Sequence, residues 1–512
     1  TENLDVRQLL VTELITEEST GEKRVTGVVC ETGERLTAHA VILATGTYLR
    51  GRIILGETIY DGGPNGQRPA MAFSDSLRAA GLRLMRFKTG TPARVDRRTL
   101  DLAETALQEG DPDAPAFSFL TDTMPDAQTP CYLTYTNEAT HAVIRANLHR
   151  APMANGVIEG IGPRYCPSIE TKIARFPDKE RHQLFLEPEG LHTNEIYVQG
   201  MSTSLPTDVQ EEFLRTIPGL QNARIMRPGY AIEYDCLDPL QLEASLAVKE
   251  IAGLYSAGQA NGTSGYEEAA AQGLVAGINA ARACMGEEPL ILRRSDGYIG
   301  VLIDDLVTKG TEEPYRMMTS RAEYRLVLRQ DNADLRLTPI GRRIGLVSDV
   351  RWARFTAKRG AIDAALRLLR ERRLSPSAET EALLAGAGIS PLRVPMSLFA
   401  LLAREGDYRA LAAVFDLPPL ADDVREEVEI MARYDGYIRK QEEQIARMER
   451  LEARRIPADT DYAAIGSLRL EAAEKLSAVR PRSIGQASRI SGVSPADISV
   501  LLVYLERARR TS

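Results

Sequence analysis

A glycine-rich loop that leads into an alanine-rich helix is the strongest candidate for ligand chemistry in this sequence. The loop covers residues 258–266 (GQANGTSGY), between a predicted strand at 253–258 and a predicted helix at 267–284. Glycines let the backbone approach a ligand closely, and a helix N-terminus offers free N–H groups. Glu267 and Glu268 in the first turn would repel a diphosphate, whereas a flavin carbonyl that gains negative charge on reduction suits this terminus. A tight structural turn into a core helix explains the same residues, and the segment by itself does not separate the two interpretations.

A second segment supports the flavin interpretation. Residues 40–44 predict a continuous apolar strand of the kind that is buried on both faces in a parallel sheet. It ends in Ala44-Thr45-Gly46, and flavoproteins with two dinucleotide-binding units carry such an ending where the chain returns to the cofactor. No segment supplies a strand, a G-x-G-x-x-G fingerprint and a helix in that order. Either the chain is not a dinucleotide-binding fold, or its first phosphate-binding unit lies before Thr1.

Cys166 is the candidate nucleophile. It lies between Pro163 and Pro167, which hold the backbone extended, and a short helix is predicted from Ser168 to Phe176. A nearby helix N-terminus and Arg164 would stabilise a thiolate, which can add to an electron-poor ring carbon such as C6 of uracil. A buried, inert cysteine is the alternative. We assign that inert role to the four other cysteines, Cys30, Cys131, Cys236 and Cys284.

A run of arginines is the candidate RNA contact. If residues 315–329 form a helix, Arg321, Arg325 and Arg329 make one basic stripe. Tyr315 and Tyr324 would add aromatic surfaces for stacking. A solvated arginine face paired with carboxylates such as Glu323 and Asp331 explains the same composition.

The elements around these motifs predict an α/β protein with a helical C-terminal region. A hairpin is expected at 25–30 and 35–38, and residues 90–240 read as a mixed α+β insertion. Beyond about residue 350 the pattern is nearly all helical. The three clearest helices are predicted at 351–373, 425–455 and 495–510.

Composition limits the function class. The chain has 512 residues, 44% of them hydrophobic, and a net charge of −8, so any nucleic-acid contact must be a local basic surface. The five cysteines are scattered and include no CxxC pair, which argues against a disulfide scaffold and against a structural zinc site. This pattern favours a reducing, cytoplasmic location. The apolar runs are too short to span a bilayer, and no export signal opens the chain.

In their order along the chain, these stretches resemble the MnmG (GidA) family of FAD-dependent tRNA uridine carboxymethylaminomethyl-modification enzymes. The matching segments are residues 44–51, 88–92, 162–170, 227–235, 257–273, 314–329 and 484–493. The resemblance implies an incomplete FAD-binding Rossmann-like domain, an inserted α+β domain and an all-helical C-terminal domain. We expect the FAD-binding domain at 1–90 and 240–290, an inserted NAD-binding and substrate domain at 91–239, and a helical region for tRNA and partner docking at 291–512.

The resemblance also implies a reaction. Such enzymes work as a homodimer with the GTPase MnmE and add a carboxymethylaminomethyl or aminomethyl group at C5 of the tRNA wobble uridine. Methylene-tetrahydrofolate supplies the one-carbon unit, glycine or ammonium the nitrogen, and NADH reduces the flavin. Cys166 matches a cysteine proposed to act on uracil, and Gln259 matches a flavin contact.

The resulting candidate residues fall into three groups. The candidate flavin-binding residues are Ala44, Thr45, Gly46, Ala70, Gly258, Gln259, Asn261, Gly262, Gly265, Tyr266 and Glu267. The candidate NAD-binding residues are Gly162, Pro163, Arg164, Tyr165, Ser168 and Lys172. The candidate RNA-binding residues are Arg316, Arg321, Arg325 and Arg329. No metal ligands are expected.

Two departures from the family and two rival functions accompany this interpretation. The family's G-x-G-x-x-G unit and a further essential cysteine would lie before Thr1, and a chain without that unit should hold FAD poorly. Ala70 stands where the family often has serine. The rivals are a folate- and flavin-dependent tRNA uridine methyltransferase, whose helical tail is shorter, and a non-catalytic tRNA-binding scaffold.

Overall fold

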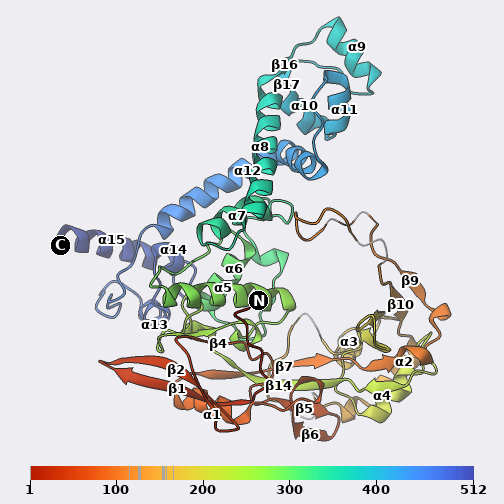
Figure 1. Cartoon of the computed structure of the whole chain (residues 1–512), viewed down its shortest axis with the longest axis vertical. Helices are drawn as coiled ribbons and strands as arrows, with labels where there is room; N and C mark the ends of the chain where they lie inside the picture. The colour runs from red at the N-terminus through yellow and green to blue at the C-terminus, as the bar shows by residue number, and fades with distance from the viewer. Residues whose placement is uncertain are drawn as a thin grey trace. The chain divides into compact units, whose positions relative to one another are not determined.

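The computed structural model describes residues 2–112, 114, 116–124, 128–152, 156, 158–164 and 167–511. It contains two compact units. Unit 1 comprises Thr1–Pro115, Thr123–Ile291 and Asp305–Met317, and unit 2 comprises Ala116–Asp122, Leu292–Asp304 and Met318–Ser512. The expected α/β protein with a helical C-terminal region is confirmed (Figure 1).

The first sheet of unit 1 is an antiparallel meander. Its order is β1 (Val11–Ser19), β2 (Glu22–Cys30) and β3 (Arg35–Thr37). Gly33 has a φ of +82° in the turn between β2 and β3, a conformation that favours glycine. The hairpin expected at 25–30 and 35–38 is therefore confirmed. Helix α1 (Met71–Ala79) packs against β1.

Two short parallel strands carry the predicted flavin motifs. β4 (Val41–Leu43) pairs with β15 (Leu254–Ser256), and α5 (Tyr266–Cys284) packs on both (Figure 1). The predicted strand, loop and helix are confirmed in that order. The expectation that the first strand is buried on both faces is wrong, because Ile42 is 38% exposed. Within the described residues, β15 is its only ladder partner, so one edge of β4 is left without a neighbouring strand.

A four-stranded antiparallel sheet of unit 1 supplies a charged interior. Its order is β6 (Thr58–Asp61), β5 (Arg52–Leu55), β14 (Tyr230–Leu237) and β7 (Leu84–Thr91). β14 lies between two partners, and all its residues after Tyr230 are buried. Glu233 and Asp235 are therefore taken into the interior with the strand and require cationic partners there.

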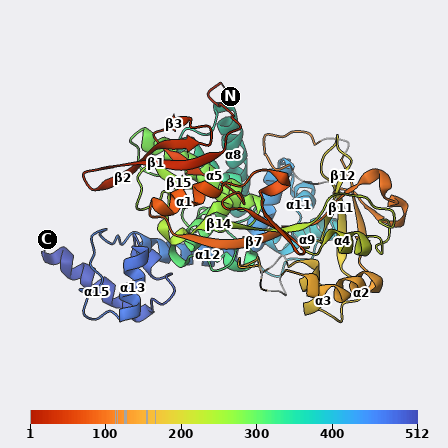
Figure 2. The ribbon, with the colours of Figure 1, turned by 90° about the horizontal axis from the view of Figure 1, so that it is seen from below.

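The α+β insertion predicted at 90–240 contains a six-stranded antiparallel sheet. Its order is β13 (Ile225–Arg227), β8 (Arg94–Asp96), β12 (Glu195–Gln199), β11 (Gln183–Pro188), β10 (Cys131–Tyr135) and β9 (Ala106–Gln108). Beside it lie α2 (Glu138–Ala146), α3 (Ile169–Arg175) and α4 (Thr207–Leu214), as Figures 1 and 2 show. Apolar residues of the sheet and of these helices form one continuous core. The short helix predicted after Pro167 is α3.

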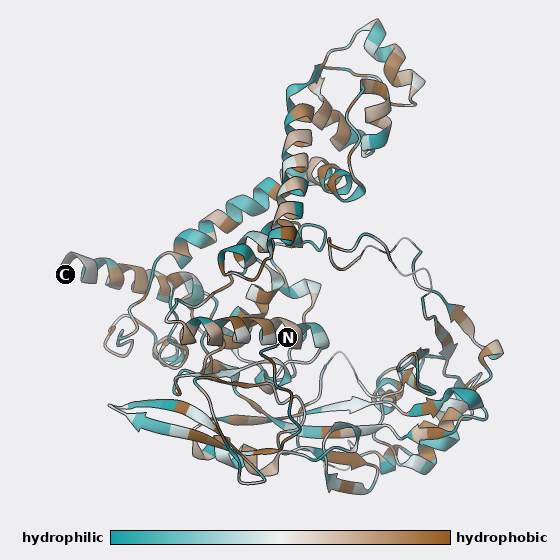
Figure 3. Ribbon diagram, viewed as in Figure 1, coloured by the Kyte–Doolittle hydropathy of each residue, from teal (hydrophilic) through white to brown (hydrophobic). Residues whose placement is uncertain are grey.

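The helices of unit 2 confirm the C-terminal prediction. The three longest predicted helices are α8 (Asp349–Glu371), α12 (Asp422–Glu452) and α15 (Pro495–Thr511). Ser348 begins α8, because its hydroxyl accepts a hydrogen bond from the backbone N–H of Arg351. Figure 3 shows α12 mostly in the hydrophilic colour, with its few buried apolar residues near its start. The charged faces of these helices therefore point away from their apolar contacts.

Shorter elements complete the described chain. In unit 2 these are α7 (Ala333–Arg343), β16 (Arg373–Leu374), α9 (Ala378–Gly386), β17 (Met396–Ser397), α10 (Leu398–Glu405), α11 (Tyr408–Phe415), α13 (Leu470–Val479) and α14 (Ile484–Ala487). Helix α6 (Tyr298–Lys309) contributes residues to both units. None of the helices in the described part of the chain is both long and apolar enough to cross a membrane.

Candidate functional site

The glycine-rich loop is held in place by its own side chains. It follows β15 as a short 3₁₀ turn (Gly258–Asn261), and Gly258 and Gly262 both have a φ of +73°. The Asn261 amide donates to the Ser256 carbonyl at 2.9 Å and to Gln272 at 2.8 Å. The Thr263 hydroxyl donates to the Gly258 carbonyl at 2.9 Å. This network fixes the loop before any ligand binds.

Three buried oxygen atoms around this loop have no hydrogen-bond partner among the residues that the structure describes. They are Oγ1 of Thr45, Oγ of Ser256 and Oδ1 of Asn261. Ser256 ends β15, Thr45 follows β4 shortly after its end, and β4 and β15 are parallel neighbours. Buried polar atoms are normally satisfied, so these atoms indicate a polar ligand. Hydroxyl and amide groups of this kind fit the hydrogen-bonding edge of a flavin ring.

The N-terminus of α5 does not fit a diphosphate. Glu268 is buried in the first turn, and its carboxylate accepts a hydrogen bond from the backbone N–H of Met317 at 2.6 Å. The Tyr266 side chain beside it is 93% exposed. A second negative charge at this terminus would be repelled by Glu268. The donor set therefore suits the ring of a flavin nucleotide better than its phosphates.

Gln259 connects the loop to the four-stranded sheet. Its amide donates to the hydroxyl of Tyr234 on β14 at 3.2 Å. Burial raises the pKa of Tyr234 above its ordinary value, so the phenol stays protonated at neutral pH. The structure therefore places the loop and β14 side by side.

Ala70, another candidate flavin-binding residue, is held at the start of α1. Its N–H donates to the Tyr48 carbonyl, and its carbonyl accepts from the backbone N–H of Arg50.

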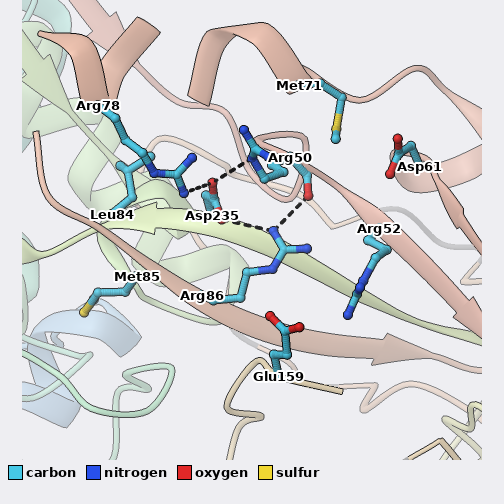
Figure 4. A pocket seen from close by; sticks show the side chains of 10 residues that line it. All are labelled: Arg50, Arg52, Asp61, Met71, Arg78, Leu84, Met85, Arg86, Glu159 and Asp235. Carbon is cyan, nitrogen blue, oxygen red and sulfur yellow. Dashed lines mark hydrogen bonds and ion pairs between the residues drawn. The ribbon is translucent and has the colours of Figure 1, made fainter. Parts of the chain in front are cut away.

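A hollow of about 570 Å³ lies in unit 1 on the four-stranded sheet (Figure 4). Its lining includes Arg50, Arg52, Arg78, Arg86 and Asp235. In that order, these residues come from the turn before β5, from β5, from α1, from β7 and from β14. Figure 4 shows the guanidinium groups of Arg50, Arg78 and Arg86 directed at Asp235. Arg78 donates to Asp235 Oδ2 at 2.7 Å, and Arg86 donates to Oδ1 at 3.0 Å.

Carboxylates balance the arginines of this hollow. Glu233 lies buried beneath Arg52, and Asp61 and Glu159 also line the hollow. Asp75 pairs with two of the arginines. The hollow is therefore an ion-pair network, and its charge by itself does not favour an anionic ligand.

The candidate NAD-binding residues are only partly described. Tyr165 and Cys166 lie outside the described residues. Gly162 runs beside the Lys88 side chain of β7, and Arg164 is exposed. At the start of α3, Ser168 is buried and its hydroxyl pairs with that of Thr171 at 2.9 Å. The Lys172 ammonium donates to the Gly200 carbonyl at 3.0 Å.

The burial expected for the four other cysteines is confirmed for Cys30 and Cys236 and is wrong for Cys284. Cys30 and Cys236 are buried, Cys131 is half-buried, and Cys284 is exposed near the end of α5. Burial raises the pKa of Cys236 and of Cys131 above the ordinary thiol value. Cys284 is exposed because it is the last residue of α5, beyond the buried positions Ala276 and Ala280. Among the described residues no group of three His, Cys, Asp or Glu side chains could hold a metal ion.

The predicted arginine helix does not form. Residues 314–332 are irregular, with one 3₁₀ turn at Thr319–Arg321. Tertiary bonds hold this segment instead: the Tyr298 hydroxyl accepts from the Met318 N–H at 2.8 Å and donates to the Met318 carbonyl at 2.7 Å. Arg321, Arg325 and Arg329 therefore do not share a helical stripe.

The side chains of this segment are also placed differently from the expectation. Tyr315 and Tyr324 are buried, so they present no stacking surface. Arg329 pairs with Asp331 at 2.9 Å and with Glu427 at 2.7 Å, as the carboxylate-pairing alternative predicts. Arg316 and Arg325 are exposed and remain candidates for RNA contact.

Sequence reasoning missed the acidic pair Glu233 and Asp235 on β14. The signal was present in the stretch at 227–235, where two acids alternate within an otherwise apolar strand. Alternate residues point to one face of a strand. An acidic pair on one face of a buried strand predicts a cluster of cations opposite it, but nothing in the local sequence identifies those cations.

Comparison with known proteins covers the whole chain. Residues 1–288 match the family described as glucose inhibited division protein A, and residues 349–442 and 444–512 match the MnmG/GidA C-terminal helical domain and C-terminal helical bundle. The tRNA uridine 5-carboxymethylaminomethyl modification enzyme MnmG of Caldicellulosiruptor saccharolyticus is 57% identical over 512 residues, which are 100% of this chain and 81% of that protein. The enzyme of the same name from Clostridium botulinum (strain Loch Maree) is 54% identical over 99% of this chain and 81% of its own length. Aquifex aeolicus GidA in its form II crystal has a TM-score of 0.88 at 44% identity, over 98% of this chain and 79% of its own.

Proposed function

We propose that this chain, which belongs to the MnmG/GidA family, acts in tRNA uridine 5-carboxymethylaminomethyl modification. It does so with a flavin and NADH. The three unpartnered oxygen atoms of Thr45, Ser256 and Asn261 carry the flavin part of the proposal. They lie around the predicted loop, and buried polar groups require a partner, which the described residues do not supply.

In this proposal the loop at 258–266 and the segment Ala44–Gly46 hold the flavin ring. The chemistry that the flavin supplies when bound is hydride acceptance from NADH and return of reducing equivalents to the methylene group joined to uridine. The protein orients the ring through Gln259, which is itself held by Tyr234. Glu268 discourages a diphosphate at the start of α5, so the ring end of the cofactor is favoured there.

The remaining roles follow the predicted residues. Gly162, Pro163, Arg164, Tyr165, Ser168 and Lys172 would bind NAD, and Cys166 would act on the uracil as nucleophile or acid–base group. Arg316 and Arg325, which are exposed, would contact tRNA. We assign residues 1–90 and 240–290 to flavin binding, 91–239 to NAD and substrate, and 291–512 to docking of tRNA and the GTPase MnmE. We further propose a homodimer in the cytoplasm that uses methylene-tetrahydrofolate as one-carbon donor.

A visible spectrum before and after addition of NADH tests the cofactor assignment. In a preparation that includes the family's G-x-G-x-x-G unit, we expect flavin absorbance that bleaches anaerobically with NADH. Absence of any flavin from that protein purified with added FAD would contradict the proposal. Mass analysis of the wobble base tests the reaction, since methylation would identify the rival methyltransferase. Cys166→Ser should abolish modification and leave circular dichroism unchanged, and full activity would remove this cysteine from the mechanism.

A further inference from the structure

Glu233 makes an unusual set of contacts for a carboxylate on a buried strand. Its side chain has no exposed area, and its Oε2 accepts from Nε of Arg52 at 3.0 Å and from Nη2 at 2.6 Å. Arg86 lies 3.7 Å from the same oxygen. Its Oε1 accepts two backbone hydrogen bonds, from the N–H groups of Glu159 and Gly160, each at 2.6 Å. One charged acceptor therefore joins β5 and β14 to a separate stretch of backbone.

The stretch that Glu233 holds leads directly into the predicted NAD segment. After Gly160, Ile161 forms a parallel bridge with Phe87 of β7, and the Lys88 N–H donates to the Ile161 carbonyl at 3.0 Å. A Cβ added at Gly160 would lie 2.8 Å from the Phe87 backbone, so the two backbones are in close contact. Gly162 then passes beside the Lys88 side chain.

The bonds of Glu233 exceed what neutralising a buried charge requires. Arg52 by itself gives a charge-assisted, two-donor contact, which is sufficient to pair a carboxylate. Asp235, two residues along the same strand, is equally buried and is paired with Arg78 and Arg86. Among the described residues, the Asp235 side chain forms its hydrogen bonds and ion pairs with arginines and none with residues 158–164. Burial on β14 alone therefore does not explain the two backbone bonds of Glu233.

We infer that Glu233 is a positioning residue: its carboxylate fixes the backbone of Glu159 and Gly160 and thereby sets where Gly162, Pro163 and Arg164 lie against β7. The role in NADH use rests on the proposed function, whereas the backbone tether does not. Without the carboxylate, two N–H groups in this stretch lose their acceptor, and the segment is held by its bridge to β7.

Hydrogen exchange followed by mass spectrometry of the whole chain tests the tether. Glu233→Gln keeps the side-chain volume, but the amide has a single oxygen, which the positively charged Arg52 should retain. The NH2 group must then face the N–H groups of Glu159 and Gly160, which lose their acceptor. We expect amide exchange of the peptide containing Glu159 and Gly160 to become at least about tenfold faster, because a buried charge-assisted bond is lost. Asp235→Asn, the matched control on the same strand, should change this peptide by less than about twofold. Unchanged exchange in Glu233→Gln, or an equal change in Asp235→Asn, overturns the inference.

A second variant separates positioning from general destabilisation. In the double variant Glu233→Gln with Arg52→Met, the amide oxygen is free to face Glu159 and Gly160, so protection of this peptide should return toward that of the unaltered protein. Further loss of protection in the double variant would contradict the tether. On the proposed function, Glu233→Gln should raise the KM for NADH about tenfold with a smaller change in kcat, a split that Asp235→Asn should not show. If the unaltered protein oxidises no NADH, the proposed function fails while the exchange result still decides the tether.

Discussion

Glu427 on α12 should make the stability of unit 2 depend on pH in the neutral range. Its side chain is 3% exposed, and its Oε1 accepts a hydrogen bond from Arg329 at 2.7 Å. Burial and the neighbouring Asp331 raise the pKa of Glu427 to about 7, against the opposing effect of Arg329. Burial also works to raise the pKa of Asp331, but hydrogen bonds from Glu427 and Arg329 outweigh it and hold that pKa below its usual range.

The sign and size of the effect follow from these directions. A carboxyl with a raised pKa binds its proton more tightly in the folded state, so its contribution is present below the unfolded pKa and is lost as the pH rises through about 7. A shift from about 4.5 to about 7 corresponds to about 3 kcal/mol in total, of which about 2 kcal/mol is lost between pH 5.5 and pH 8. Asp331 is ionised in both states across this window, so it adds no slope there.

Urea unfolding at pH 5.5 and pH 8 measures this loss. The single tryptophan, Trp352 on α8, reports on unit 2, and α8 packs against α12. Glu427→Gln keeps the side-chain size and removes the titration, so its unfolding free energy should fall by about 2 kcal/mol less than that of the unaltered protein over this range. Equal pH dependence in the two proteins would refute the reasoning. Glu429→Gln, on the same helix, is the control.

Three further predictions concern unit 1. His141 is buried and hydrogen-bonded to the Thr136 hydroxyl at 2.8 Å, and burial lowers its pKa, so the free energy of unfolding should fall as the pH drops below about 6.5. His141→Gln should flatten this pH dependence in urea unfolding monitored by circular dichroism, and an unchanged slope would exclude His141 as its source. Gly262→Ala should lower the unfolding free energy by about 1–3 kcal/mol and reduce flavin absorbance, because a Cβ at φ +73° would lie 2.9 Å from the Phe87 ring. An unaltered melting temperature of this variant would count against the prediction. Cys284 should react with a maleimide at pH 7 well before Cys236, whose pKa is raised by burial, and labelling of both at one rate, followed by peptide mass analysis, would contradict the described burial.

The elements that local sequence specifies were predictable. The helix at 267–284 has strong helical propensity and becomes α5, and the hairpin around Gly33 becomes β2 and β3. The glycine loop could be identified from its glycines and the helix that follows, and the structure places two of them, Gly258 and Gly262, at positive φ. The helix considered at 315–329 does not form: a spacing of four between arginines is compatible with a helix, but bonds from Tyr298 to the Met318 backbone hold the segment irregular.

What the sequence by itself determined is the set of short-range structures: the long helices of unit 2, the hairpin, and a glycine-rich turn at the end of an apolar strand. Their causes, periodicity and backbone freedom, act within a few residues. Only the tertiary structure decided that Glu233 meets Arg52, 181 residues away, and Glu159, 74 residues away. Such contacts depend on which strands become neighbours, and the buried carboxylate then has to be satisfied by whatever donors that pairing brings within reach.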